Sequence, residues 1–99
     1  MEFTNEKPKC NFALPDKPTV RQMLEYFSAS AGVEQSKFLE RNWEGAKALI
    51  IPASWKCEVM PELDADLGNL TDPTAADVII WAGMQVREYM NDLERIPKN

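Results

Sequence analysis

Residues 72–96 read DPTAADVIIWAGMQVREYMNDLERI and form the clearest helical pattern in the chain. Asp72 is a helix-capping residue type, and Pro73 suits the first turn of a helix, where an amide hydrogen has no partner to lose. At 100° per residue, one set of apolar side chains falls within a stripe of about 120°, which is typical of a helix face that packs on a core. The set comprises Ala75, Val78, Ile79, Ala82, Val86, Tyr89, Met90 and Leu93.

A second apolar group lies away from this stripe. Ile80, Trp81 and Met84 are neighbours at i, i+1 and i+4, so they would form one patch among polar residues. Such a patch is covered either by another part of the chain or by another molecule. Two interpretations stay open. Either the helix is central and packed on both sides, or these three residues are a protein-binding site, for which Trp and Met are favoured types.

Two more helices are predicted upstream. Thr19 and Gln22 have the spacing of a capping box, directly after a proline, and predict a helix over residues 19–31. Its apolar stripe would be Val20, Met23, Leu24, Phe27 and Ala31, with Gly32 as a stop.

A helix over residues 34–51 follows and ends at Pro52. Leu39, Trp43, Ala46 and Ile50 recur in it at helical spacing. Gly45 lies inside this pattern, where glycine costs about 1 kcal/mol relative to alanine. We therefore expect another backbone or a bulky ring to approach Gly45 closely.

The remaining segments are short or polar. Residues 10–14 alternate in polarity, as do residues 54–60, so the two could pair as a short two-stranded β element. Alternatively, Phe12 and Leu14 could simply rest on the helices. We predict a mainly α fold: an extended N-terminal arm over residues 1–13 and a single three-helix domain over residues 14–96, with helices at about 19–31, 34–51 and 72–95.

Composition narrows the function classes. Ninety-nine residues suit one domain, and 44% apolar residues with three tryptophans argue against disorder. No apolar run approaches the ~20 residues of a membrane span, and no signal-peptide pattern opens the chain, so we expect a soluble cytoplasmic protein without a membrane partner.

The chain has no histidine and two cysteines, which removes imidazole chemistry and the usual zinc sites. No phosphate-binding glycine loop is present. We therefore expect no enzyme activity, no cofactor and no metal, and we interpret Cys10 and Cys57 as idle buried thiols.

Charge is uneven along the chain. Residues 58–77 carry six carboxylates and no cation, a surface that would repel a phosphate backbone, so nucleic-acid binding is not expected. The same region fails as an EF-hand: counted from Asp64, Gly68 falls at position 5 instead of 6, and Ala75 occupies position 12, where a glutamate is needed.

The order of several sequence blocks resembles small tail assembly chaperones of tailed bacteriophages (siphophage type). The blocks are LPDKPTVRQ at residues 14–22, WEGAKALI at 43–50, WKCE at 55–58, and DP at 72–73 opening ADVIIWAG at 76–83. The resemblance implies a mostly helical, non-enzymatic adaptor in the host cytoplasm. It would bind and solubilise the tape measure protein during tail assembly.

An alternative function follows from the charge. A small acidic phage or mobile-element protein could use residues 58–77 to bind and block a host protein, such as a defence or nucleic-acid-binding protein. In either interpretation the partner is a protein, Ile80, Trp81 and Met84 are the candidate contacts, and self-association is a further option.

Overall fold

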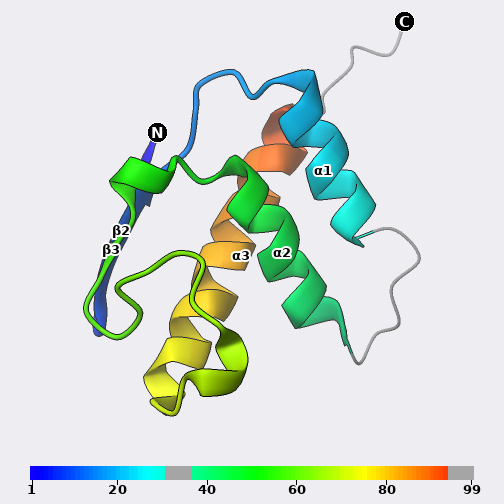
Figure 1. The fold of residues 1–99 in the computed structure, drawn as a ribbon. Coiled ribbons are helices and arrows are strands. Elements are labelled where there is room, and N and C mark those ends of the chain that lie inside the picture. Colours follow the sequence, from blue (N-terminus) through cyan, green and yellow to red (C-terminus); the bar gives the residue numbers. More distant parts are fainter. Residues whose placement is uncertain (31–36, 94–99) are drawn as a thin grey trace, which may run out of the picture.

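The computed structural model describes residues 1–30 and 37–93, and combines three helices with a small antiparallel sheet (Figure 1). The strands are β1 (Glu2–Glu6), β2 (Lys9–Ala13) and β3 (Lys56–Cys57); the helices are α1 (Val20–Ser30), α2 (Phe38–Leu49) and α3 (Pro73–Leu93); short 3-10 turns are η2 (Pro52–Ser54) and η3 (Leu67–Asn69). The predicted class, a mainly α three-helix domain, is wrong because a three-stranded sheet in the order β1-β2-β3 is part of the fold.

Residues 1–13, expected to be an extended arm, form a β-hairpin instead. β1 pairs antiparallel with β2, and the register places Phe3 opposite Phe12. The two rings stack with centroids 5.1 Å apart. Because side chains alternate across a strand, Cys10 and Phe12 face the core and are fully buried. β1 carries one apolar residue among polar ones, so its own sequence shows no strand pattern.

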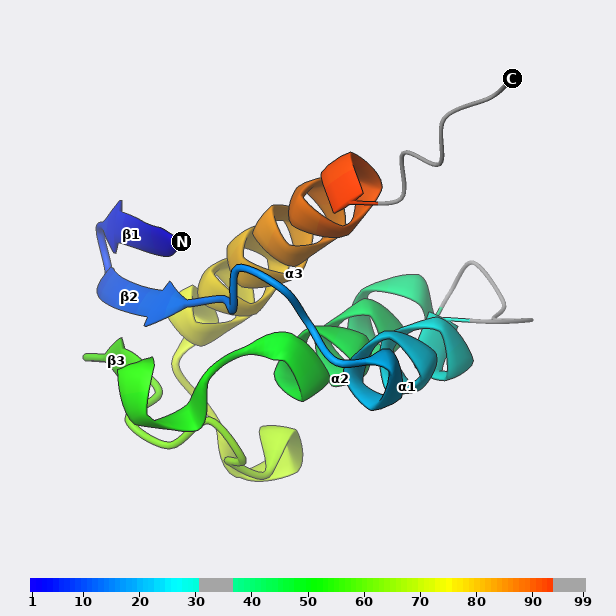
Figure 2. The ribbon, with the colours of Figure 1, turned by 90° about the horizontal axis from the view of Figure 1, so that it is seen from above.

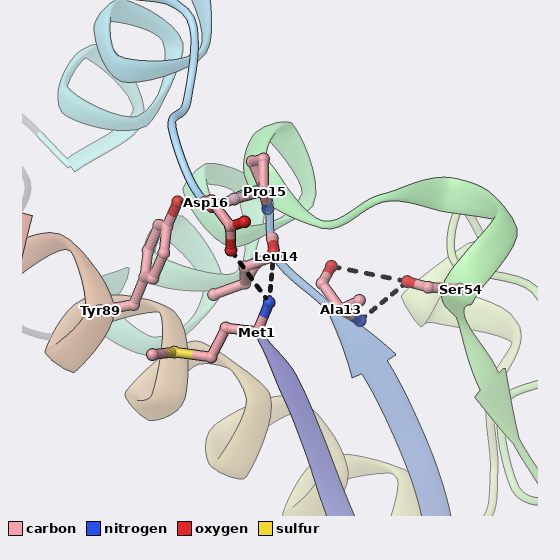
Figure 3. A network of polar contacts seen from close by, with 7 residues as sticks. All are labelled: Met1, Ala13, Leu14, Pro15, Asp16, Ser54 and Tyr89. Carbon is pink, nitrogen blue, oxygen red and sulfur yellow. Dashed lines mark hydrogen bonds and ion pairs between the residues drawn. The ribbon is translucent and has the colours of Figure 1, made fainter.

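β3 extends the sheet on the other side of β2. Asn11 pairs with Lys56, within the two segments for which pairing was considered. Past this short pairing, the hydroxyl of Ser54 forms hydrogen bonds with β2 that a neighbouring strand would otherwise form. It accepts a hydrogen bond from the Ala13 amide (2.8 Å; Figure 3). It also lies 2.5 Å from the Ile51 carbonyl oxygen, to which it donates. The backbone amide of Ala13, which β3 does not reach, is therefore hydrogen-bonded.

The predicted helix starts of α1 and α3 are confirmed. Thr19 and Gln22 exchange reciprocal bonds, from the Thr19 amide to Gln22 Oε1 (2.8 Å) and from the Gln22 amide to Thr19 Oγ1 (3.1 Å). Asp72 Oδ1 accepts from the amide (2.9 Å) and the hydroxyl (2.7 Å) of Thr74, and α3 begins at Pro73. Predicted features at residues 31–36 and 94–96, including the Gly32 stop, lie outside the described residues.

The helices form an open layer with α2 between α1 and α3 (Figures 1 and 2). Gly45 lets α1 approach α2: a Cβ there would stand 3.2 Å from the carbonyl oxygen of Tyr26, which confirms the expected close approach. On the other side of α2, the buried side chain of Asn42 reaches Gly83 of α3.

The hairpin covers a further side of α3. The Trp81 ring meets Phe12 edge-on, with centroids 5.3 Å apart. Trp43, Trp55 and Met60 are buried in the same core, and Trp55 Nε1 donates to the Met60 carbonyl (2.8 Å). The core thus lies among α2, α3 and the sheet.

This arrangement leaves much of α1 uncovered by the described residues. Val20 is 67% exposed and Leu24 61% exposed, although both belong to the stripe predicted to face the core. Among residues 20–29 of α1, Tyr26 is the one that is buried. The stripe was predicted for a helix packed within a three-helix domain, whereas α1 packs mainly against one neighbour, α2.

A polar network joins the hairpin, the segment before α1 and the last part of α3 (Figure 3). The Met1 amino group donates to the Leu14 carbonyl (3.1 Å) and lies 3.6 Å from a carboxylate oxygen of Asp16. The Tyr89 hydroxyl donates to the Pro15 carbonyl. These contacts fix the chain where it leaves the sheet.

Candidate protein-binding site

A groove of about 570 Å³ opens between the start of α2, the turn η3 and the first turns of α3. We refer to it as the α2–α3 groove. Its larger apolar lining residues are Leu39, Leu67, Leu70, Ile79 and Ile80. A concave apolar surface of this size is typical of a binding site.

Local hydrogen bonds hold the loop side of the groove in shape. Asp66 caps η3: one of its carboxylate oxygens accepts from the Gly68 amide (3.0 Å) and the other from the Asn69 side chain (3.1 Å). Leu67 and Leu70 are half-buried against the core on either side of this turn. The loop wall is therefore a packed structure, and the candidate site is largely formed before any partner arrives.

The structure separates the three candidate residues predicted from sequence. Ile80 lines the α2–α3 groove and is 39% exposed, and Met84, one turn further along α3, is 41% exposed. Trp81 is half-buried and turned toward Phe12 of the hairpin. Ile80 and Met84 thus lie on an open surface, and Trp81 connects α3 to the sheet.

Leu39 is a candidate site residue that the sequence pattern did not reveal. Leu39 shares its helical spacing with the buried Trp43, but it is 49% exposed and lines the groove with Ile80. The helical spacing of Leu39 does not show whether its side chain is covered by the core or faces a groove. Leu39, Ile80 and Met84 are the exposed large apolar side chains at this end of α2 and α3.

The polar residues that line the groove include carboxylates. Glu40 and Asp72 are exposed at its border, and Asp64, Asp66 and Asp77 are exposed on neighbouring segments. Hydrogen bonds from the Thr74 hydroxyl and then from its amide hold the pKa of Asp72 below its ordinary value. Asp72 is therefore ionised at neutral pH, and this border is negatively charged.

The exposed stripe on α1 is a second apolar surface. Val20 and Leu24 lie one turn apart and, with Arg21 and Glu25, line an open depression of about 540 Å³. Among the helices that the structure describes, α1 packs mainly against α2. Because this surface is also apolar and exposed, it provides a control position for substitutions in the α2–α3 groove.

The described residues offer few other groups that could react chemically or hold a metal ion. Both thiols, Cys10 and Cys57, are free and buried. Within residues 1–30 and 37–93, no group of three or more cysteine, aspartate or glutamate side chains is placed to hold a metal ion. No helix in these ranges is long and apolar enough to cross a membrane.

Comparison of the chain with protein-family models, curated proteins and solved structures found no match.

Proposed function

We propose that this chain is a non-enzymatic tail assembly chaperone of a tailed bacteriophage, which binds the tape measure protein in the α2–α3 groove and keeps it soluble. The main observation behind the proposal is a preformed apolar groove lined by Leu39 and Ile80. Ile80 also belongs to the apolar patch that the sequence predicts. The order of sequence blocks supports the choice of partner.

A helical client fits this surface. An amphipathic helix docks through apolar side chains at i, i+3, i+4 and i+7, which would reach Leu39, Ile80 and Met84. Glu40 and Asp72 at the border favour lysine or arginine residues flanking the client's apolar face. We therefore expect the bound client segment to be a helix with one apolar stripe and basic margins.

The binding test compares two variants of matched chemistry. Ile80→Glu introduces a charge into the groove, and Leu24→Glu introduces the same charge on the exposed stripe of α1. We expect Ile80→Glu to weaken binding of the tape measure protein at least tenfold, because a desolvated charge at an apolar contact is costly. Leu24→Glu should bind as the unmodified chain does. Unchanged binding by Ile80→Glu would exclude the groove as the client site.

Solubility and gene order test the client. On co-expression, the tape measure protein should stay soluble with the unmodified chain and precipitate with Ile80→Glu. A slippery frameshift sequence near the end of the gene, followed by a large tape measure gene, would support the proposal. An isolated early gene would exclude it.

A second candidate function has one observation in its favour. The carboxylates of residues 58–77 are exposed, including Glu58, Glu62 and Asp64, so this face could block a basic site on a host defence or nucleic-acid-binding protein. Exchanging these three for glutamine or asparagine would abolish such inhibition and leave apolar client binding in the groove largely intact.

A further inference from the structure

Cys10 and Cys57 lie directly opposite each other on β2 and β3, although they are far apart in the sequence. The neighbouring pair is hydrogen-bonded, because the Glu58 amide donates to the Lys9 carbonyl (3.1 Å). Hydrogen-bonded and non-hydrogen-bonded pairs alternate along an antiparallel ladder, so the two cysteines occupy a non-hydrogen-bonded pair. The Cα atoms of such a pair are about 4.5 Å apart, within the range of roughly 4.4–6.8 Å that a disulfide requires.

The surroundings of the two thiols differ. Cys10 is fully buried, whereas Cys57 is 7% exposed on a strand of two residues at the edge of the sheet. Burial raises the pKa of the Cys10 thiol, and the hydrogen bond and charge of Cys57 raise it further. Because the thiolate is the reactive form, Cys10 reacts slowly on its own, and Cys57 is the thiol that a reagent reaches first.

We propose that Cys10 and Cys57 are a redox-active pair that closes to an intramolecular disulfide when a low-molecular-weight disulfide such as oxidised glutathione is supplied. The Cys57 thiolate attacks one glutathione sulfur; the glutathione disulfide bond breaks, one glutathione thiolate leaves, and a mixed disulfide forms on Cys57. The Cys10 thiolate then attacks Cys57 Sγ and releases the second glutathione. The two protein thiols are oxidised by two electrons, one glutathione disulfide is reduced to two thiols, and the two cysteine protons pass to them.

The bond would tie β3 to β2 and close the chain between residues 10 and 57 into a covalent loop that contains α1 and α2. A disulfide across a long loop stabilises the fold by restricting the unfolded chain. The α2–α3 groove includes neither cysteine, so this inference is independent of the proposed function.

The test uses the full chain, equilibrated in glutathione redox buffers with and without 6 M urea. Intact mass and peptide mapping distinguish loss of two hydrogens from addition of glutathione. We expect the ratio of closed to open protein, at a given buffer composition, to be at least tenfold higher without urea, because the fold holds the thiols together. The oxidised chain should melt at least about 5 °C above the reduced one, and a thiol reductant should reverse the shift. Equal or lower closure without urea would overturn the proposal.

Two single variants test the order of steps. Cys10→Ser should accumulate glutathione on Cys57, and Cys57→Ser should react at least tenfold more slowly because only the buried Cys10 is left. Faster reaction of Cys57→Ser would show that Cys10 is attacked first and would overturn the assigned roles. The urea comparison, made on the unmodified chain, stays decisive if either variant fails to fold.

Discussion

Ile80 and Trp81 are neighbours in the sequence and lie in different surroundings in the fold. Ile80 lines an open groove, and Trp81 meets the ring of Phe12 on the hairpin. Their angular position on the helix could be predicted, because it follows from 3.6 residues per turn. The strand that meets Trp81 lies more than sixty residues away, and the groove beside Ile80 is formed with residues of α2 and η3, so no pattern within the helix contains that information.

Tyr89 links α3 to the segment before α1, since its hydroxyl donates to the Pro15 carbonyl (Figure 3). Burial, and then the Asp16 carboxylate, raise the pKa of Tyr89 above its ordinary value of 10.0. The ionised phenol is therefore less favourable in the folded than in the unfolded chain. The stabilisation is complete below pH 10 and is lost as the pH rises toward the folded-state pKa.

We accordingly expect Tyr89→Phe to lower the free energy of unfolding by about 1 kcal/mol at pH 8, where the hydrogen bond is intact. The difference from the unmodified chain should shrink above pH 10. Urea unfolding followed by circular dichroism between pH 8 and pH 11 measures both values. The Cys10 thiol also affects stability in this range, because burial raises its pKa in the folded chain above that in the unfolded chain, but this effect is the same in both proteins and cancels in the difference. A difference that stays constant with pH would contradict the role assigned to Tyr89.

The helix starts were well predicted, and the pairing of residues 10–14 with 54–60 was considered, whereas the pairing of β1 with β2 was missed. The starts of α1 and α3 follow from contacts within three residues of Thr19 and Asp72, so the sequence contains the whole signal. β1 exists because β2 lies beside it, and strand pairing is a non-local interaction. Ile80 was predicted as part of an apolar patch and lines the groove, whereas Leu39 was missed because the spacing of a helical stripe does not show which residues cover it.

Gly45 sets the distance between α1 and α2. A Cβ there would stand 3.1 Å from a Tyr26 ring carbon and 3.2 Å from the Tyr26 carbonyl oxygen, so a larger side chain must push α1 outward. We expect Gly45→Leu to lower the free energy of unfolding by about 2 kcal/mol through overpacking. Glu44→Leu is the control, because Glu44 is exposed on the same helix and its ion pair with Lys47 contributes little. Equal melting temperatures for the two variants would mean that the helices do not meet at Gly45.

At the scale of the whole molecule, α1 is the helix with the least support. It packs mainly on α2, whereas α3 packs on α2 and also receives Phe12 from the hairpin. Segments with few buried apolar contacts open at lower free energy than the core. The fold is thus expected to contain a firm unit of sheet, α2 and α3, with α1 as an outer layer.

Native-state hydrogen exchange in low urea tests this division. We expect the amides of α1 to exchange with an opening free energy at least about 2 kcal/mol below that of the α3 amides. Thr19→Ala, which removes the hydroxyl of the capping box, should widen the gap by about 1 kcal/mol. Equal protection of α1 and α3 would show that the three helices open as one unit.

The position of β1 has a consequence for solubility. β1 is an edge strand of the sheet, and its exposed residues are Glu2, Thr4 and Glu6. If the β1 strands of two molecules paired antiparallel about Thr4, Glu2 of each would face Glu6 of the other, and like charges directly opposite each other destabilise a sheet. Charged edges of this kind discourage edge-to-edge aggregation. Glu2 and Glu6 make β1 too polar for its sequence to predict a strand. The same two charges disfavour pairing between the β1 strands of two molecules.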